Sequence, residues 1–243
     1  KKLKILEISK ELKKIKDLYF KNFIDYRIKN LAMAIIASKI CGLKDKYIYP
    51  AIKKLKDVNG RLELIKEYPN KVKVFIDYAH TPDALLKAII SLKNNYGNNI
   101  SLVFGCGGDR DKKKRPLMAK IANEHCNKIY VTDDNPRNES PTRIRKHLLK
   151  YISKNKVFDI GNRELAIKKS IQNAEPNETI LIAGKGHEEK QIYKNKIINI
   201  SDKKIVKKIK VKTKISKKRN NFLQNRLILK QILGKTKLVN FNG

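Results

Sequence analysis

The chain has 243 residues, enough for one large or two small domains, and 41% of them are hydrophobic, as is typical of globular proteins. It has no apolar run of about 18 residues, so the sequence predicts no membrane-spanning helix. The formal net charge of +34 has two interpretations. One is nucleic-acid binding. The other is AT-rich codon usage, which favours Lys, Ile and Asn alike and fits lysines that are spread along almost every segment.

Residues 1–18 are rich in Lys, Leu and Ile and indicate either a helix or a strand, whereas helices are predicted from residue 28 onward. Apolar residues at helical spacing predict a helix over 28–40, which ends at Gly42, and a second helix over 49–55. The second helix leads to the sequence Asn59-Gly60-Arg61-Leu62-Glu63. Tyr68-Pro69-Asn70 then reads as a turn, and we expect a domain boundary there.

Beyond this turn, strands alternate with helices. The predicted strands are 72–77, 100–104, 128–131, 157–160 and 179–183, followed by a hairpin of 191–193 with 197–200. The predicted helices are 82–93 with Thr81 as its cap, 116–126 with Leu117, Ile121 and Ala122 on one face, 141–151, 162–174, and 202–208 capped by Ser201-Asp202. This alternation predicts an α/β fold with a Rossmann-like, doubly wound, mostly parallel sheet and an antiparallel edge.

Two charged loops follow neighbouring strands of this predicted sheet. Gly-Cys-Gly-Gly-Asp-Arg-Asp occupies 105–111, and Thr-Asp-Asp-Asn-Pro-Arg occupies 132–137. Because the carboxyl ends of parallel strands meet at one edge, we expect Arg110, Asp133, Asp134, Asn135 and Arg137 to converge there. Such a set suits a small ligand that carries both carboxylate and ammonium groups. The alternative is a set of capped turns and surface ion pairs. A dinucleotide loop is excluded, because the third glycine of that fingerprint is missing.

These loops, together with Gly-Lys-Gly-His-Glu at 184–188 and Asp-Tyr-Ala-His-Thr-Pro-Asp-Ala at 77–84, resemble the carboxyl-terminal domain of the Mur ligases. The likeness covers about residues 30–208 and is strongest to the members that add meso-diaminopimelate to UDP-N-acetylmuramoyl-L-alanyl-D-glutamate. It implies a cytoplasmic ligase of peptidoglycan synthesis that uses ATP and Mg²⁺. It also implies neither a membrane nor a specific nucleic-acid partner.

The resemblance implies a binding site for diaminopimelate. Its residues would be Arg110, Asp134, Asn135, Arg137, Gly184 and Glu188. The distal end of diaminopimelate is a zwitterion, so its pocket needs cations for the carboxylate and anions for the ammonium. Arg137 would grip the carboxylate with two parallel N–H bonds, while Asp134 and Glu188 would face the ammonium. Lysine lacks this second carboxylate, so Arg137 favours diaminopimelate over lysine.

The resemblance also implies a nucleotide site. Asn30 and Asp77 with His80 would lie near the base and ribose of ATP, and Arg61 would contact its phosphates. For His80 a purely structural strand-to-helix turn is the alternative, and for Arg61 a solvated turn residue.

The resemblance further implies that the catalytic parts lie upstream of residue 1, namely the P-loop, the Mg²⁺ ligands and the UDP-binding domain. We therefore expect this chain alone to be inactive, and a non-catalytic part of a split or fused ligase is the alternative. The expected division is 1–67, the end of the central ATP-binding domain; 68–210, the carboxyl-terminal domain; and 211–243. Cys41, Cys106 and Cys126 lack metal-ligand spacing and indicate a reduced protein.

The tail beyond residue 208 has its own pattern. Residues 210–218 are lysine-rich without a core face and predict a linker. A helix over 221–233 and an extended run over 237–241 follow. This pattern is similar to the start of the Mur ligase that adds D-alanyl-D-alanine, which implies a fused second ligase. A basic, disordered tail is the alternative.

Overall fold

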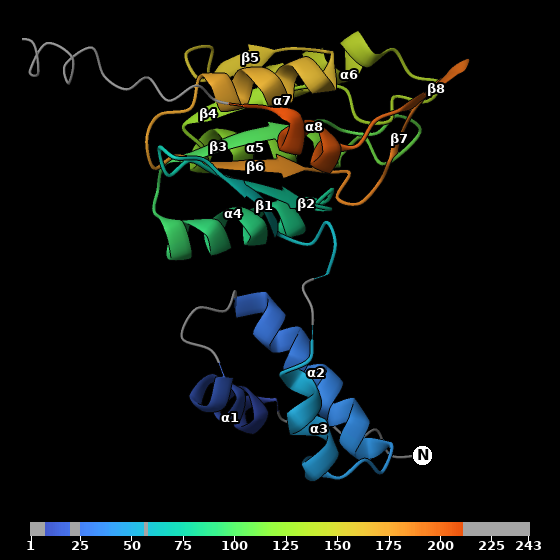
Figure 1. Cartoon of the computed structure of the whole chain (residues 1–243). Coiled ribbons are helices and arrows are strands. Elements are labelled where there is room, and N and C mark those ends of the chain that lie inside the picture. Colours follow the sequence, from blue (N-terminus) through green and yellow to red (C-terminus); the bar gives the residue numbers. More distant parts are fainter. Residues whose placement is uncertain (1–7, 20–24, 56–57, 211–243) are drawn as a thin grey trace, which may run out of the picture. The chain divides into compact units, whose positions relative to one another are not determined.

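The structure is a computed structural model that describes residues 8–19, 25–55 and 58–210. The predicted helix over 221–233, the predicted run over 237–241 and nearly all of the predicted linker lie outside these residues. The described chain consists of a helical segment and an α/β domain (Figure 1). None of the described helices is long and apolar enough to span a membrane.

The helical segment contains α1 (Ser9–Tyr19), α2 (Asp25–Ile40) and α3 (Asp45–Ile52). Helix α1 lies where either a helix or a strand was expected, and α3 begins four residues before the predicted 49–55. The three helices enclose a small buried cluster of Ile15, Ile28, Ala32, Ile35, Ile48 and Ile52. At its rim the Glu11 carboxylate accepts hydrogen bonds from Lys39 Nζ at 2.5 Å and from Tyr49 Oη at 2.8 Å, which ties α1 to α2 and α3.

The α/β domain is built on a six-stranded sheet. Its strands are β1 (Glu63–Glu67), β2 (Lys73–Asp77), β3 (Ile100–Phe104), β4 (Lys128–Val131), β5 (Val157–Asp159) and β6 (Thr179–Ala183). The strand order is β1-β2-β6-β3-β4-β5. Only β1 runs antiparallel, against β2, and every other pair is parallel. The predicted α/β fold with a mostly parallel sheet and an antiparallel edge is therefore confirmed.

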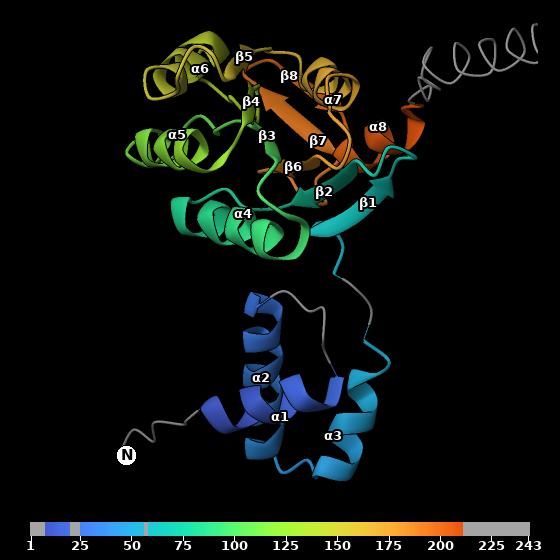
Figure 2. The ribbon, with the colours of Figure 1, turned by 90° about the vertical axis from the view of Figure 1, so that its left-hand side faces the viewer.

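Helices cover both faces of this sheet. Helices α4 (Pro82–Tyr96), α5 (Lys114–His125) and α6 (Pro141–Leu149) cover one face, and α7 (Arg163–Gln172) and α8 (Asp202–Lys208) cover the other (Figure 2). All residues of β3 and β6 are buried between the two helical layers. Strands buried on both faces read as continuous apolar runs, which is why their bounds agree with the prediction.

Three details differ from the predictions. The antiparallel edge is β1, whereas the predicted hairpin, β7 (Lys190–Tyr193) with β8 (Lys196–Asn199), forms a separate two-stranded sheet. Since β1 pairs with β2, the sheet begins at Glu63, ahead of the division expected at residue 67. Helix α5 buries Ala122 and packs Ile121 against the core as predicted, but it also buries Met118 and Ala119, while Leu117 is 51% exposed.

A fully buried ion pair joins the sheet to the helices behind it. Arg163 donates from Nε and Nη2 to the two carboxylate oxygens of Asp202, both at 2.8 Å, and from Nη2 to the carbonyl of Ala183 at 3.1 Å. Both side chains are completely buried. Asp202 was predicted to help cap α8, but its side chain instead locks α8 to α7 and to the end of β6. Ser201 occupies the cap position without a side-chain cap hydrogen bond.

Replacing Arg163 by Met is expected to lower the free energy of unfolding by about 3–5 kcal/mol, because it leaves the Asp202 carboxylate buried and unpaired. Urea unfolding measures the loss. Lys87→Met is the control, since it breaks only the exposed pair with Asp83 and should change stability by about 0.5 kcal/mol or less. Equal losses in the two variants would contradict the structural role assigned to Arg163.

Candidate functional site

A pocket of about 460 Å³ opens where the loops after β2, β3, β4 and β6 meet. All six residues predicted to bind diaminopimelate line it: Arg110, Asp134, Asn135, Arg137, Gly184 and Glu188. They come from three loops, at 105–113, 132–140 and 184–189, that are far apart in the sequence. The parallel sheet therefore brings together the side chains that the motifs indicated.

Asp134 is the anion of this pocket without a protein partner. Its side chain is largely buried, with 8% of the residue exposed, yet within the described part of the chain its carboxylate accepts no hydrogen bond and forms no ion pair. Gly184, at φ +108°, makes room for it, because a Cβ there would lie 2.6 Å from Asp134 Oδ2. Burying a carboxylate without a partner is costly, so this position suits a cation supplied by a ligand.

Arg137 is the cation on the other side of the pocket. It has a left-handed backbone, at φ +52°, and its Nη1 donates to the carbonyls of Gly108 at 2.9 Å and of Asn135 at 3.3 Å. A Cβ on Gly107 would lie 2.9 Å from Nη1, so glycine permits this approach. In the described residues Nε and Nη2 have no hydrogen-bond partner. They form the edge of a guanidinium that binds a carboxylate with two parallel bonds.

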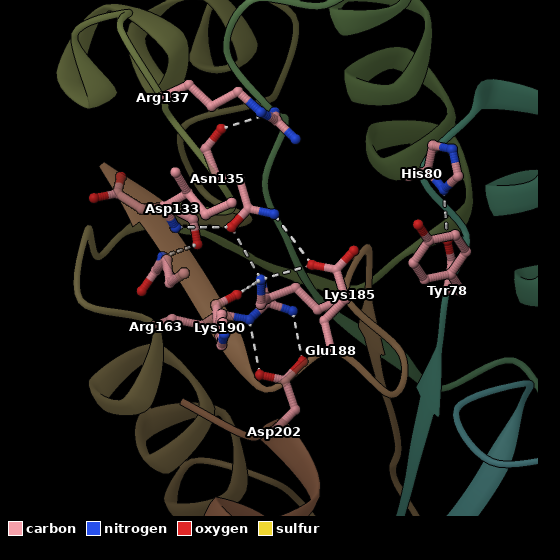
Figure 3. A network of polar contacts seen from close by, with 12 residues as sticks. Tyr78, His80, Asp133, Asn135, Arg137, Arg163, Lys185, Glu188, Lys190 and Asp202 are labelled. Atoms are coloured by element: carbon pink, nitrogen blue, oxygen red, sulfur yellow. Dashed lines mark hydrogen bonds and ion pairs between the residues drawn. The ribbon is translucent and has the colours of Figure 1, made fainter. Parts of the chain in front are cut away.

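Asn135 and Glu188 are linked to each other across the pocket. Asn135 Nδ2 donates to Glu188 Oε2 at 3.1 Å (Figure 3). Burial by itself would raise the pKa of the Glu188 carboxyl. The hydrogen bond and charge of Lys185, helped by Asn135 and Tyr78, instead lower this pKa below its usual value, so the group is a carboxylate at neutral pH. Arg110 lies at the exposed mouth of the pocket.

Asp133 does not join the pocket, contrary to the expected convergence of both aspartates. Its carboxylate pairs with Arg145 and accepts a hydrogen bond from Tyr193 Oη at 2.9 Å. Its carbonyl accepts from Gln191 Nε2 at 3.0 Å, and Ile192 donates from its backbone N to Asn135 Oδ1 at 3.0 Å. Adjacent residues of an extended loop point to opposite sides, so Asp133 faces the hairpin and fastens β7 to this loop.

Three of the four residues predicted to bind nucleotide lie together in the α/β domain. Arg61, Asp77 and His80 line a second pocket of the α/β domain, and the Arg61 guanidinium lies 4.5 Å from the centre of the Tyr78 ring. The Asp77 carboxylate is buried and accepts from the backbone N–H of Leu62 at 2.6 Å and of Ala79 at 2.7 Å. Asp77 therefore holds the two turns together. Asn30 lies on α2 with an exposed side chain.

His80 and Thr81 form the entry to α4. His80 is exposed, with Nδ1 2.9 Å from the carbonyl of Tyr78, and this carbonyl–ring contact gives the His80 ring its orientation. Thr81 caps α4 as predicted, accepting from the Ala84 backbone N–H at 3.3 Å, with Pro82 at the first helical position.

Three residues that the motifs did not single out support the site. The ring of Tyr78 packs against those of His80 and His187. Buried Arg115 joins Glu139 to the carbonyl of Gly107, and so links the two charged loops. The third residue is Lys185, which is fully buried between two glycines. A lysine directly after an all-buried strand was the available signal for it.

The cysteines and acidic residues offer no metal site in the described ranges, where no group of three or more His, Cys, Asp or Glu residues is arranged to hold an ion. Cys106 and Cys126 are buried, and burial raises the pKa of each thiol to about 12. Both are therefore neutral, unreactive core residues at physiological pH.

Comparisons with known proteins agree with this geometry. Residues 60–186 match the family model described as "Mur ligase, glutamate ligase domain". The UDP-N-acetylmuramoyl-L-alanyl-D-glutamate–2,6-diaminopimelate ligases of Rickettsia typhi and Haemophilus influenzae are 43% and 42% identical over 185 and 181 residues. These alignments cover 75% and 74% of this chain and 37% of each relative.

Solved structures give the same result. The structure of a UDP-N-acetylmuramoyl-L-alanyl-D-glutamate–2,6-diaminopimelate ligase aligns with a TM-score of 0.58 and 35% identity, over 75% of this chain and 37% of that one. A UDP-N-acetylmuramate–alanine ligase from Thermotoga maritima shares the fold. It aligns with a TM-score of 0.51 and 18% identity, over 65% of this chain and 34% of that one. The chain thus spans about 37% of the length of the curated relatives it matches. Since the family model covers more than half of its residues, the chain belongs to the Mur ligase family.

Proposed function

We propose that this chain is the carboxyl-terminal part of a cytoplasmic, ATP-dependent ligase that adds meso-diaminopimelate to UDP-N-acetylmuramoyl-L-alanyl-D-glutamate in peptidoglycan synthesis. The observation that carries the proposal is one pocket in which the buried, unpartnered carboxylate of Asp134 and the open guanidinium edge of Arg137 both face the ligand space. The relatives named for this reaction support it.

The pocket fits the distal, non-reacting end of diaminopimelate. That end carries a carboxylate and an ammonium on one carbon. Arg137 would bind the carboxylate through Nε and Nη2, and Asp134 would bind the ammonium. Glu188 and the second N–H of Asn135 would complete the hydrogen bonds of the ammonium and carboxylate. Arg110, at the mouth, would add positive charge beside the carboxylate.

The chemical step joins the other amine of diaminopimelate to the γ-carboxylate of D-glutamate. That carboxylate takes the γ-phosphoryl group of ATP and releases ADP. The amine then attacks the acyl carbon, phosphate leaves, and the nitrogen loses a proton to complete the amide. The residues of this chain would bind the distal end and so hold the amine in line with the acyl carbon, which lowers the entropic barrier.

The nucleotide would lie beside the loop after β2. Arg61 would meet its phosphates, and His80 and Asn30 would lie near its sugar and base, while Asp77 would act by shaping the loop. No group of acidic residues or histidines suited to Mg²⁺ occurs in the described residues. We therefore propose that its ligands, and the P-loop, are supplied by other segments of the ligase.

The domain division also stays a proposal. Residues 1–67 would close the central ATP-binding domain, 68–210 would form the carboxyl-terminal domain, and 211–243 would follow it.

Asp134→Asn tests the proposal most directly. We expect the affinity of the chain for meso-diaminopimelate to fall at least tenfold, because the ammonium loses its charged partner. Stability to urea should stay equal or rise, because a buried unpaired charge is removed. Calorimetry and unfolding measure the two effects. Asp83→Asn, at an exposed position on α4, is the matched control that should change neither.

Arg137→Ala, made in the complete ligase, should lower kcat/KM for meso-diaminopimelate by about a hundredfold, because a charge-assisted bidentate pair is lost. The KM for ATP should stay the same. Arg143→Ala is the matched control, since Arg143 is exposed on α6 outside the pocket. An unchanged kcat/KM for meso-diaminopimelate would show that Arg137 does not bind its carboxylate.

Residues 1–243 by themselves should release no phosphate from ATP in the presence of meso-diaminopimelate and the UDP-linked dipeptide. The sequence contains no Gly-x4-Gly-Lys-Ser/Thr loop: Gly234-Lys235-Thr236 has Leu229 where the first glycine would stand. Binding of meso-diaminopimelate by the same sample shows that it is folded. Phosphate release that requires both substrates would place the catalytic groups within this chain.

A further inference from the structure

Lys185 is a buried cation behind two residues that line the pocket, Asn135 and Glu188. It follows β6 directly, and its side chain is fully buried. Its ammonium donates to Asn135 Oδ1 at 3.1 Å, to Glu188 Oε2 at 3.0 Å and to the carbonyl of Lys190 at 2.6 Å (Figure 3). A lysine ammonium has three N–H donors, and all three are used. Lys185 therefore has no donor left for a ligand, and it acts on the residues around it.

Its first effect is on the carboxamide of Asn135. Oδ1 accepts from Lys185 Nζ and from the backbone N–H of Ile192. Because only the oxygen of a carboxamide can accept hydrogen bonds, these two donors fix which end of the group is the oxygen. Nδ2 must then point the other way, toward Glu188 Oε2. The amide thus offers its remaining N–H to the pocket.

Its second effect is on the carboxylate of Glu188. Oε2 accepts from both Lys185 Nζ and Asn135 Nδ2, so this oxygen is held on the protein side. The Lys185 charge also compensates that of Glu188. The negative charge that remains available to an ammonium is therefore on Asp134. Glu188 contributes a hydrogen-bond acceptor in a fixed orientation.

We infer that Lys185 is a positioning residue that holds Asn135 and Glu188 in the orientation in which they meet the distal end of the amino acid. The inference rests on the proposed function for the identity of the ligand. The three-centre arrangement of Lys185, Asn135 and Glu188 consists of protein groups alone. It can therefore be tested separately from ligand binding.

The first experiment needs no ligand. Lys185→Met keeps the length and the buried apolar stem while removing the ammonium. In the full chain, ¹³C NMR follows the titration of the Glu188 carboxyl. Lys185 keeps this pKa below the ordinary 4.5, so its removal should move the titration to higher pH. The Asn135 side-chain amide signals should shift as well. Lys196→Met, an exposed lysine on β8, should change neither.

The second experiment measures binding of meso-diaminopimelate by calorimetry. Lys185→Met should weaken binding about 10- to 100-fold, the usual effect of losing a hydrogen bond to a charged group. In a Glu188→Ala background the same change should weaken binding less. The loss of affinity in the double variant should therefore be smaller, by about fivefold or more, than the product of the losses in the two single variants. The affinity for ATP should not change in Lys185→Met, because Lys185 does not line the second pocket.

The outcomes separate the two claims. An unchanged Glu188 titration with unchanged Asn135 amide signals in Lys185→Met overturns the positioning role, whatever the ligand. The positioning role is also overturned if the loss of affinity in the double variant equals the product of the losses in the two single variants. If Lys185→Met shows the expected NMR changes but the unmodified chain does not bind meso-diaminopimelate, the positioning role stands and the proposed substrate is wrong. Should Lys185→Met fail to fold, Lys185→Gln, which keeps two N–H donors but no charge, gives the same NMR test.

Discussion

The insertion of β6 between β2 and β3 is the constraint on which the site depends. β6 pairs in parallel with both strands, and its five residues are buried between the helical layers. Its carboxyl end therefore emerges in the middle of the sheet edge, with the loops after β2 and β3 on either side. Gly184 donates from its backbone N–H to the carbonyl of Asp77 at 3.1 Å, so the loop after β6 is anchored at its first residue. Everything that lines the pocket is placed relative to this central loop.

Several charged groups behind and beside the pocket form ion pairs with one another, whereas others remain open to a ligand. Arg163 with Asp202, Arg145 with Asp133, and Lys185 with Glu188 are ion pairs that the protein completes by itself. Buried pairs add little net stability compared with apolar packing, but each fixes the direction of its side chains. Asp134 and the outer edge of Arg137 are left to the ligand. The division leaves the Asp134 carboxylate and the outer edge of Arg137 open to a ligand, while the paired groups around them are held by the protein.

The glycines of the charged loops have a steric role in this arrangement. Gly107 gives the Arg137 guanidinium its approach to the loop carbonyls, and Gly184 gives the Asp134 carboxylate its place beside the backbone. A glycine-rich loop after a strand commonly cradles phosphate. Here Gly107 lets a charged side chain of the neighbouring loop come close, while Gly105 and Gly108 let the backbone of that loop come close, which explains a glycine motif without the dinucleotide spacing.

The sequence by itself determined every described strand except β1, the alternation of strands with helices and the set of residues around the pocket. β3, β4 and β6 agree with their predicted bounds because strands buried on both faces are continuous apolar runs. Only the tertiary structure decided which charged groups face the ligand. Asp133 and Asp134 are neighbours with the same chemistry, yet one is paired with Arg145 and the other is open to the pocket. Lys185 and the Arg163–Asp202 pair were not predicted, because burial and long-range pairing, here across 39 residues, leave no local periodicity in a sequence.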